Sequence, residues 1–435
     1  MENSVETPQE NALDFTSEVR PPQLAEIVHQ LRRARQRLAR RSTDSILAAL
    51  DTVVREWSGP DSSWSRSAAE MLPAATGFSP AMVRQALPFQ VEPLRAPHLR
   101  ALLEEEIGEN AFRPEPLAGA PNLIVHIVPG NLPGLAAIPV ALGLSLKSAV
   151  LVKAASGDRV FPALWARSIR EIDAELGACV ATCYWPGGNR ACEEVAFAAA
   201  DLVVASGDDA SVADAKARCT ARFIGHGHRM SFAVVTREVL ADDGLAEKAA
   251  EALAFDVALW DQRGCLSPQA CFLEATFEEA SNFASRLAPA FGRQARRLPS
   301  RRLSVEERVA VRRFRDEAEW ENIAGRSRAL FLPDGTLEWS IVVEADPVLR
   351  PTPLCRSLRL LPVRRVSEIA TALLPGRSFL QAAGVACSAA RRGEIESLLA
   401  QAGVAHVSGL GEMQKPPLSW RQGGRPRIAD WLAFV

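Results

Sequence analysis

The chain lacks the features that define several broad classes of protein. Its 50 lysines and arginines nearly balance its 52 aspartates and glutamates, so the formal net charge of −2 gives no electrostatic reason to expect nucleic acid or an anionic membrane as a partner. Its 8 cysteines include no CxxC pair, which argues against a disulfide scaffold and against a zinc site. We therefore expect free thiols, no bound metal and no nucleic-acid partner.

Uninterrupted hydrophobic runs and targeting sequences are also lacking. The longest apolar region, Leu123–Leu146, is broken by His126, Asn131 and several prolines and glycines, which is too much interruption for a membrane span. The N-terminal stretch MENSVETPQENALDF is acidic and polar, unlike a secretory or transit peptide. No complete GxGxxG or P-loop motif occurs. The expected protein is cytoplasmic and has no integral membrane segment.

The spacing of apolar residues predicts a helical N-terminal region followed by two α/β domains. Helical spacing begins near Leu24, and from Pro121 short β-rich runs alternate with helical stretches. Continuous apolar strands separated by helices indicate a parallel sheet covered on both faces. The predicted divisions are a flexible tail at 1–20, a helical region at 21–115, a nucleotide-binding α/β domain at 116–255, a catalytic α/β domain at 256–390, and a C-terminal segment at 391–435 that packs back on the cofactor or oligomerisation side.

The same runs place the individual elements. The predicted strands are 123–128, 149–153, 180–184 and 201–205 in the first domain, and 271–274, 329–332, 340–343 and 358–362 in the second. Helices are expected at 158–176, 190–200, 277–287, 305–319 and 395–401. Ligands of parallel sheets bind at the carboxyl ends of the strands, so the loops at those ends carry the candidate site residues.

The loop Ile127–Gly134, after the first of these strands, is the first candidate. Its prolines and glycines, including Pro129 and Gly130, predict a rigid irregular backbone from which the Asn131 amide projects, as suits a donor to a developing oxyanion. An asparagine that caps the following helix would look the same in the sequence. The residues alone do not decide between these two roles.

Two further segments are candidates for nucleotide contacts. Lys153 ends a strand and is followed by Ser156, which suits contact with a ribose or phosphate, although strand-end lysines are commonly just solvated. The segment Ala205–Ser211 has the pattern of a strand, a glycine turn and a helix start, and helix N-termini bind phosphate. Both signals are short, so they indicate a nucleotide-type domain without identifying its ligand.

Cys265 is the candidate nucleophile. It follows Gly264 in a stretch expected to form a loop between a helix and a strand, whereas cysteines such as Cys271 lie in apolar strand sequence typical of the core. The neighbouring Arg263 would lower the pKa of the thiol and favour the thiolate. No histidine stands at a spacing that declares a catalytic partner, and a structural loop cysteine is the alternative.

Taken in order, these segments resemble the aldehyde dehydrogenase superfamily, and most of all its LuxC-type acyl-CoA reductase branch, known from aldehyde supply to bacterial luciferase. The resemblance is carried by HIVPGNLPG, LVKAASGD, GHGHRMSF and WDQRGCLSPQ, with weaker agreement from PLCRSLRLLPV to GVAHVSGLGEM. It implies an aldehyde-dehydrogenase-like α/β fold, in which a Rossmann-type cofactor domain and an α/β catalytic domain follow a helical N-terminal region.

The resemblance also implies roles for individual residues. Cys265 stands at the position of the superfamily's nucleophile, and Asn131 at the asparagine of its oxyanion hole. Lys153 stands at the lysine that contacts the cofactor ribose. The residues implied in cofactor binding are Pro129, Gly130, Lys153, Ser156, Gly188, Ser206, Gly207 and Gly227.

Three departures from the superfamily pattern bear on the reaction. Gly225 stands where hydrolytic members carry a glutamate general base, so water is poorly activated to attack an acyl-enzyme. The glutamate that usually contacts the nicotinamide ribose has no counterpart around Thr352–Arg356. Ser156 replaces a glutamate that contacts the adenosine ribose in NAD-preferring relatives, which admits a 2′-phosphate and favours NADPH.

The predicted function is the NADPH-dependent reduction of an acyl thioester, either fatty acyl-CoA or an acyl-carrier-protein thioester, to the fatty aldehyde through a Cys265 acyl-enzyme and a thiohemiacetal. Two alternatives stay open: an NAD(P)-dependent aldehyde-oxidising dehydrogenase, and a non-catalytic assembly subunit of the same fold. By analogy with the superfamily we expect a homo-oligomer, a dimer or tetramer, and an acyl-supplying enzyme as a further partner.

Overall fold

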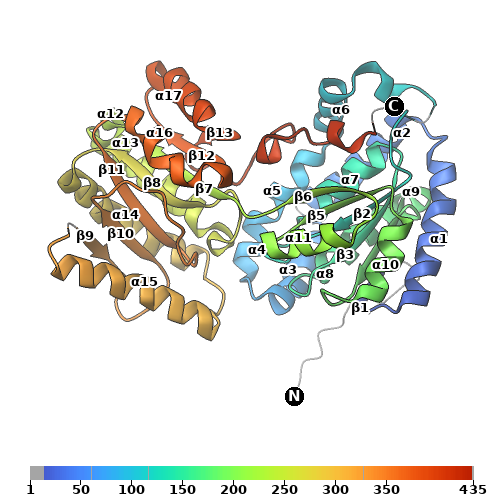
Figure 1. Cartoon of the computed structure of the whole chain (residues 1–435), viewed down its shortest axis with the longest axis horizontal. Helices are drawn as coiled ribbons and strands as arrows, with labels where there is room; N and C mark the ends of the chain where they lie inside the picture. Colours follow the sequence, from blue (N-terminus) through green and yellow to red (C-terminus); the bar gives the residue numbers. More distant parts are fainter. Residues whose placement is uncertain (1–13, 60, 116, 327, 434–435) are drawn as a thin grey trace. The chain divides into compact units, whose positions relative to one another are not determined.

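The computed structural model describes residues 14–59, 61–115, 117–326 and 328–433 (Figure 1). Contacts divide the chain into two compact units. The first extends to His228 and also contains residues 417–419 and the chain from Arg425 onward, while the second contains residues 229–416 and 420–424. No helix in the described part of the chain is long and apolar enough to cross a membrane.

The predicted helical N-terminal region is confirmed in the first unit. Its α-helices are α1 (Pro21–Leu38), α2 (Thr43–Ser58), α3 (Ser63–Thr76), α4 (Pro80–Ala86), α5 (Pro88–Val91) and α6 (Ala96–Glu106). The hydroxyls of Ser42, Ser62 and Ser79 accept hydrogen bonds from backbone N–H groups in the first turns of α2, α3 and α4. Gly77, with a φ of 80°, ends α3 in the left-handed region that glycine adopts without a steric penalty.

A six-stranded parallel sheet forms the centre of the first unit. Its strand order is β1-β4-β3-β2-β5-β6. The strands are β1 (Asp14–Glu18), β2 (Leu123–Ile127), β3 (Ala149–Ala154), β4 (Val180–Tyr184), β5 (Leu202–Ser206) and β6 (Arg222–His226). The predicted parallel sheet is therefore present.

Helices cover both faces of this sheet. Helices α1 and α10 (Arg190–Ala199) share a hydrophobic core with Val125, Leu151 and Val203 on one face. On the other face, α7 (Ala137–Ser145) lies so close to the strands that a Cβ added at its Gly143 would contact Val150. The remaining helices, α8 (Val160–Ile172), α9 (Ala174–Gly177) and α11 (Asp209–Arg218), connect the strands.

The strand order creates a switch point between β2 and β5. From β2 the chain proceeds through β3 to β4 on one side, and it then adds β5 and β6 on the other side. In open parallel sheets, the crevice beside such a point at the carboxyl ends of the strands binds the ligand. The loops after β2 and β5, which carry Asn131 and Gly207, lie at this point.

Two strands of the first sheet were not predicted. Residues 14–18 fall in the expected flexible tail at 1–20, yet they form β1 and pair in parallel with β4; residues 1–13 of that range lie outside the described residues. β6 was missed because its sequence, RFIGH, begins with arginine and ends with histidine, which leaves too short an apolar run to identify a strand.

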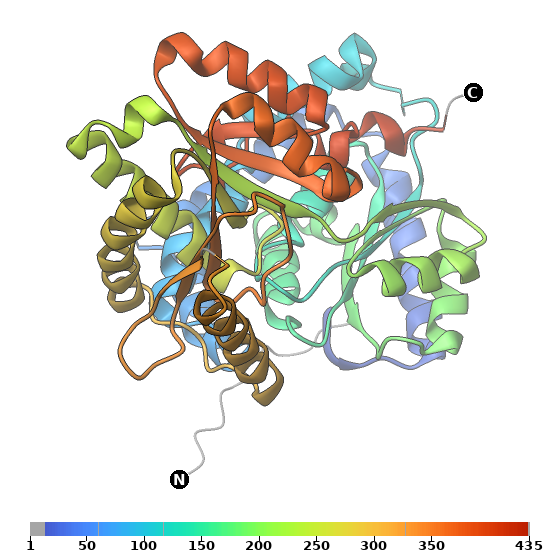
Figure 2. The same cartoon turned by 60° about the vertical axis from the view of Figure 1, so that its left-hand side comes forward.

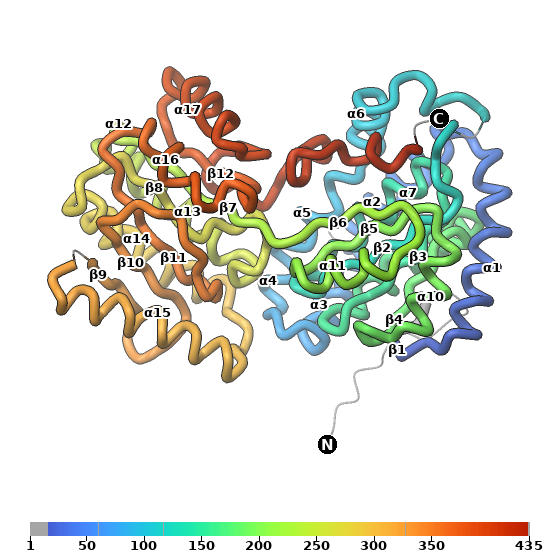
Figure 3. The backbone as a smooth tube through the Cα atoms, viewed as in Figure 1, coloured from blue at the N-terminus to red at the C-terminus, as the bar shows by residue number. Residues whose placement is uncertain are grey.

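The second unit contains a seven-stranded sheet with the order β13-β12-β7-β8-β11-β10-β9. Figure 3 traces the backbone of this unit, in yellow to red. The edge strand β9 is antiparallel to β10, and the other neighbours are parallel. The strands are β7 (Met230–Val235), β8 (Pro268–Glu274), β9 (Arg328–Phe331), β10 (Ser340–Glu344), β11 (Ser357–Val363), β12 (Leu380–Ala386) and β13 (His406–Gly409).

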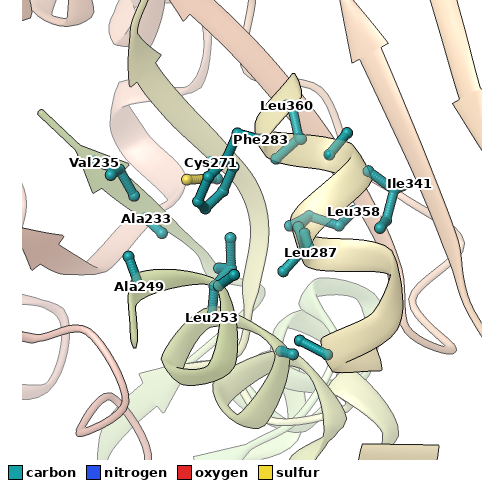
Figure 4. Close-up of a cluster of buried hydrophobic side chains, with 14 of the residues drawn as sticks. Ala233, Val235, Ala249, Leu253, Cys271, Phe283, Leu287, Ile341, Leu358 and Leu360 are labelled. Atoms are coloured by element: carbon teal, nitrogen blue, oxygen red, sulfur yellow. The ribbon is translucent and has the colours of Figure 1, made fainter. Parts of the chain in front are cut away.

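Helices also cover both faces of the second sheet. On one face, α13 (Asp243–Ala258) and α14 (Phe277–Arg297) pack side chains such as Leu253 and Leu287 onto Ala233 and Leu358 (Figure 4). On the other face lie α16 (Ile369–Leu373) and α17 (Ala389–Ala402), as Figure 2 shows. α12 (Arg237–Leu240) precedes α13, and α15 (Val305–Ile323) packs beside β9 and β10.

The α/β class expected from the sequence, with two sheets and a helical N-terminal region, is confirmed, but the division of the chain differs in detail. The second unit begins at Arg229, so β7, α12 and α13 belong to it, whereas the sequence placed them in the nucleotide-binding domain at 116–255. The expected C-terminal segment at 391–435 is shared: α17 and β13 lie in the second unit, and residues after 424 lie in the first. There the Glu106 carboxylate accepts hydrogen bonds from the backbone N–H groups of residues 427–429.

Candidate active site

Backbone contact between two loops of the first unit fixes the position of Asn131. A Cβ added at Gly157 would lie 2.6 Å from the carbonyl oxygen of Gly130, and one added at Gly130 would lie 2.8 Å from the Cβ of Ala155. Only glycine permits so close an approach. The N-cap of α7 is Ala136, so Asn131 does not cap this helix, which was the alternative role left open by the sequence.

Lys153 lies near the end of β3 and is half-buried. Burial lowers the pKa of Lys153, while the Glu193 carboxylate raises it and Arg159 lowers it further. A desolvated ammonium group gains from a nearby polar or anionic ligand, as the ribose or phosphate of a nucleotide would provide. Ser156 is exposed on the adjoining loop.

Two carboxylates accept backbone hydrogen bonds at the turn after β5. Asp208 accepts a hydrogen bond from the Ser211 N–H at 2.8 Å and caps α11. Asp209 accepts one from the His228 N–H at 2.8 Å, and a Cβ added at Gly227 would collide with the same carboxylate. The start of α11 already carries negative charge, which disfavours it as the phosphate site suggested by the sequence.

The space around Gly225 is filled. A Cβ added there would lie 2.6 Å from Cγ1 of Val212 and 3.2 Å from the Phe223 ring. A larger side chain such as glutamate therefore requires a local rearrangement of β6 or α11.

The candidate cofactor residues lie at one edge of the first sheet. Because its strands are parallel, their carboxyl ends share this edge. The residues at or just after these ends are Pro129, Gly130 and Asn131 for β2, Lys153 and Ser156 for β3, Gly188 for β4, Ser206 and Gly207 for β5, and Gly227 for β6. A switch point of a parallel sheet, with a half-buried lysine and several glycines in the adjoining loops, is a suitable place for a dinucleotide.

Cys265 belongs to the second unit, in the loop between the 3-10 helix η3 (Leu259–Gln262) and β8. It is the exposed cysteine among the described residues. By contrast, burial raises the pKa of the Cys179 thiol to about 12 and of the Cys355 thiol to about 11. The thiolate is the reactive form of cysteine, so those buried thiols are unsuited to nucleophilic attack.

An unusual turn leads into Cys265. Trp260, Asp261 and Gln262 have φ values of 53°, 50° and 65°, three successive non-glycine residues in the left-handed region. Each such residue costs about 1–3 kcal/mol and persists only where its surroundings hold it. The turn before the thiol is therefore maintained by tertiary contacts.

A second left-handed turn supplies those contacts. Leu354, Cys355 and Arg356 have φ values of 60°, 53° and 59°. Arg356 donates to the Asp261 carboxylate from Nε at 2.9 Å and pairs with it through Nη2 at 2.7 Å. The Gln262 amide donates to the carbonyl of Ser357 and accepts from the Ser357 N–H, both at 2.8 Å.

Two residues on neighbouring strands contact Cys265 directly. The Ser231 hydroxyl, on β7, donates to the carbonyl oxygen of Cys265 at 2.6 Å. The Gln381 side chain, on β12, points its Nε2 at the sulfur at a distance of 4.0 Å. Sequence reasoning missed both, because nothing within either strand marks a residue that contacts a loop more than thirty positions away.

Arg263 is engaged with a carboxylate. Its Nη1 lies 2.9 Å from Oε1 of Glu307, and Arg301 pairs with the same carboxylate. The Arg263 guanidinium is thus shared with a carboxylate, and the two arginines and Glu307 together leave one net positive charge beside the Cys265 loop. No group of three or more histidine, cysteine, aspartate or glutamate side chains in the described part of the chain is arranged to hold a metal ion.

Solved structures of aldehyde dehydrogenases share this fold. Aldehyde dehydrogenase 21 from Physcomitrella patens, in complex with succinate, matches with a TM-score of 0.69 and 13% identity over 95% of this chain and 89% of that one. The NADP-dependent glyceraldehyde-3-phosphate dehydrogenase from Bacillus halodurans, complexed with NADP, matches with a TM-score of 0.67 and 13% identity over 90% and 84%. A mutant of aldehyde dehydrogenase C from Pseudomonas syringae, complexed with NAD+ and octanal, matches with a TM-score of 0.66 and 13% identity over 90% and 82%.

The aldehyde-dehydrogenase-like fold expected from the sequence is therefore confirmed. The family profile of acyl-CoA reductases (LuxC) matches residues 38–424. This match spans most of the sequence, so the chain belongs to the acyl-CoA reductase (LuxC) family, and it is an oxidoreductase, as the resemblance implied. No curated protein sequence matches the chain significantly.

Proposed function

We propose that the protein reduces an acyl thioester, such as fatty acyl-CoA, to the aldehyde through a covalent acyl group on Cys265, with NADPH as the hydride donor. The observation that carries this proposal is the environment of Cys265. Its thiol is exposed, whereas its backbone is held by the Ser231 hydroxyl and by the turn that Asp261 and Arg356 fix. An accessible sulfur on a rigid backbone suits a nucleophile, because reaction rates depend steeply on position.

The first half of the reaction is an exchange of thioesters. The Cys265 thiolate attacks the acyl carbon, the bond from this carbon to the thiol carrier breaks, and the carrier leaves as a thiol after taking up a proton. Asn131 and the backbone N–H of Cys265 are the proposed donors to the tetrahedral oxyanion. Loss of one such donor typically slows a reaction by about 10²–10³-fold.

The second half converts the acyl-enzyme to the aldehyde. The bound nicotinamide cofactor supplies the hydride that reduces the acyl carbon. The resulting thiohemiacetal, as its oxyanion on Cys265, then re-forms the carbonyl and breaks its carbon–sulfur bond, which releases the aldehyde and regenerates the thiolate. Lys153 is proposed to hold the adenosine ribose, and Ser156 to leave space for a 2′-phosphate.

The filled space around Gly225 supports transfer to a thiol carrier over hydrolysis. No carboxylate fits at this position as the strand stands, because Val212 would contact the first added carbon at 2.6 Å. Without a general base, water attacks an acyl-enzyme slowly. This argues against the aldehyde-oxidising alternative.

Intact mass spectrometry tests the proposal. The protein is incubated with short-, medium- and long-chain acyl-CoAs in the absence of NADPH. We expect a mass increase of one acyl group in the wild type and in Cys387→Ala, a half-buried control cysteine, and none in Cys265→Ala. Addition of NADPH should discharge the adduct and produce aldehyde, and the best-accepted acyl-CoA identifies the substrate.

Three results would contradict the proposal. Aldehyde formation at the wild-type rate by Cys265→Ala would exclude the acyl-enzyme. Rapid oxidation of aldehyde to acid without any thiol acceptor would favour a hydrolytic dehydrogenase. Failure of the wild type to bind NADPH in a titration would favour a non-catalytic assembly subunit. Light scattering of the same preparation measures whether the protein is the homo-oligomer that we propose.

A further inference from the structure

The amide of Gln381 is a buried polar group close to the Cys265 sulfur. Its Nε2 lies 4.0 Å from Sγ of Cys265, and the side chain is 0% exposed. Its Oε1 is buried and accepts no hydrogen bond from any residue that the structure describes. An unsatisfied buried carbonyl is unfavourable, whereas methionine would fill a similar volume without this cost. The stability of the fold therefore does not explain a glutamine here.

An irregularity in the sheet directs Gln381 toward the thiol. β12 pairs with β7 through Leu380 and Met230, and the pairing resumes at Ala383 and Phe232, so β12 contains one residue more than β7 in this interval. The extra residue lies at positions 381–382. Such register shifts re-aim side chains and recur beside active sites.

The Ser231 hydroxyl ties this irregularity to the nucleophile loop. It accepts a hydrogen bond from the backbone N–H of Ala382 at 3.2 Å and donates to the carbonyl of Cys265 at 2.6 Å. Ala382 directly follows Gln381, and Ser231 is fully buried. The separation between the Gln381 amide and the Cys265 sulfur is thus set by a short chain of bonded groups.

We propose that Gln381 is a further catalytic residue, whose side-chain N–H donates to the Cys265 thiolate and favours this form at neutral pH. The proposal rests on the acyl-enzyme mechanism above. Hydrogen bonds to an ionised acceptor are stronger than those between neutral groups. The amide stabilises the sulfur before attack and again when the thiolate leaves the thiohemiacetal, and it takes no proton itself. Arg263 is engaged by Glu307, so the amide adds, at the sulfur itself, to the stabilisation that the sequence had assigned to the arginine alone.

The pH dependence of Cys265 reactivity tests this role. The full-length wild type, Gln381→Met and Gln381→Asn are alkylated with iodoacetamide over a range of pH, and the Cys265 peptide is quantified by mass spectrometry because the chain has 8 cysteines. Methionine removes the amide, and asparagine withdraws it from the sulfur. We expect both variants to shift the midpoint upward by about one pH unit, with about tenfold slower alkylation at neutral pH and convergence with the wild type at high pH.

Gln414→Met is the matched control. Gln414 is also a buried amide close to the nucleophile loop, but it donates to the Ser267 hydroxyl at 3.0 Å. Its replacement disturbs the same region without removing a group from the sulfur, so the midpoint should stay at the wild-type value. A purely structural role of Gln381 would change rates equally at every pH.

Two outcomes overturn the inference: an unchanged midpoint in both Gln381 variants, or an equal upward shift in Gln414→Met. These outcomes are distinguishable from failure of the proposed function. If the wild type forms no acyl adduct, the acyl-enzyme mechanism fails, yet alkylation still reports whether the amide stabilises the thiolate. If the adduct forms but the midpoint does not move, only the role of Gln381 is lost.

Discussion

Replacing Arg356 with methionine would remove the cation that holds the turn before Cys265. In the wild type, Asp261 and Arg356 are each 1% exposed and are joined by two contacts of 2.7 and 2.9 Å. Without the guanidinium, the buried carboxylate would keep the Arg301 backbone N–H, at 3.0 Å, as a donor. We expect the free energy of unfolding of the second unit to fall by about 3–5 kcal/mol, the usual cost of leaving one member of a buried ion pair alone.

The same substitution should slow acylation. Trp260, Asp261 and Gln262 would be free to leave the left-handed region, and relief of about 1–3 kcal/mol at each residue favours this rearrangement. Cys265 follows three positions later, and a displacement of its sulfur by about 1 Å would reduce the acylation rate on the order of 100-fold. Urea unfolding, monitored by tryptophan fluorescence, measures the free energy of unfolding. Single-turnover mass spectrometry with acyl-CoA measures the rate of acylation of Cys265.

Two comparisons make this result decisive. Arg313→Met breaks an exposed pair with Glu317, and it should cost less than about 0.5 kcal/mol and leave acylation unchanged. Combining Asp261→Asn with Arg356→Met removes both charges, so the double variant should be more stable than the sum of the single losses implies. An Arg356→Met protein within about 1 kcal/mol of the wild type, with a normal acylation rate, would refute the reasoning.

Three other substitutions test the Asn131 loop, the cofactor preference and a buried carboxyl group of the second unit. Gly157→Ala should lower kcat/KM about 10–100-fold because the added Cβ would displace the Gly130 carbonyl and with it the Asn131 loop. The control Gly393→Ala, which has open space around it, should leave kcat/KM unchanged. Equal activity of the two variants would show that the contact between Gly157 and Gly130 does not position Asn131. Ser156→Glu should reduce the ratio of kcat/KM for NADPH to that for NADH roughly tenfold or more through repulsion of the 2′-phosphate, and an unchanged ratio would argue against the cofactor assignment. Burial raises the pKa of the Asp256 carboxyl to about 8. Between about pH 4 and 8 the folded state therefore holds a proton that the unfolded state has already lost, so the free energy of unfolding falls as the pH rises through this window. Asp256→Asn should flatten this fall, as urea unfolding at several pH values would reveal.

Much of the fold could be predicted because its strands are buried on both faces. β2, β3, β4 and β5 are continuous apolar runs, and their ends agree with the sequence prediction within one residue. β7 and β12 escaped detection although they are buried, because the first follows β6 almost without a break and the second is rich in alanine and glycine. A strand of small residues has no pattern that separates it from a helix.

The candidate site was also predictable only in part. The order of the loops and the place of Cys265 between a helix and a strand follow from local sequence, and both are present in the structure. The contacts of Cys265 do not follow from local sequence. Ser231, Arg356 and Gln381 approach it or its turn from three strands or strand ends that are distant in the chain.

The sequence by itself determined the class of the fold and the edge of the first sheet that carries Asn131 and Lys153, and it identified Cys265 as the candidate nucleophile among the cysteines. Only the tertiary structure decided how this thiol is held and what surrounds it. A left-handed turn of non-glycine residues has no local signature, because its cost is offset by the distant ion pair of Asp261 and Arg356. The one-residue shift in β12 that brings Gln381 to the sulfur likewise exists only when β7 and β12 are paired, since register is a property of two strands and not of one.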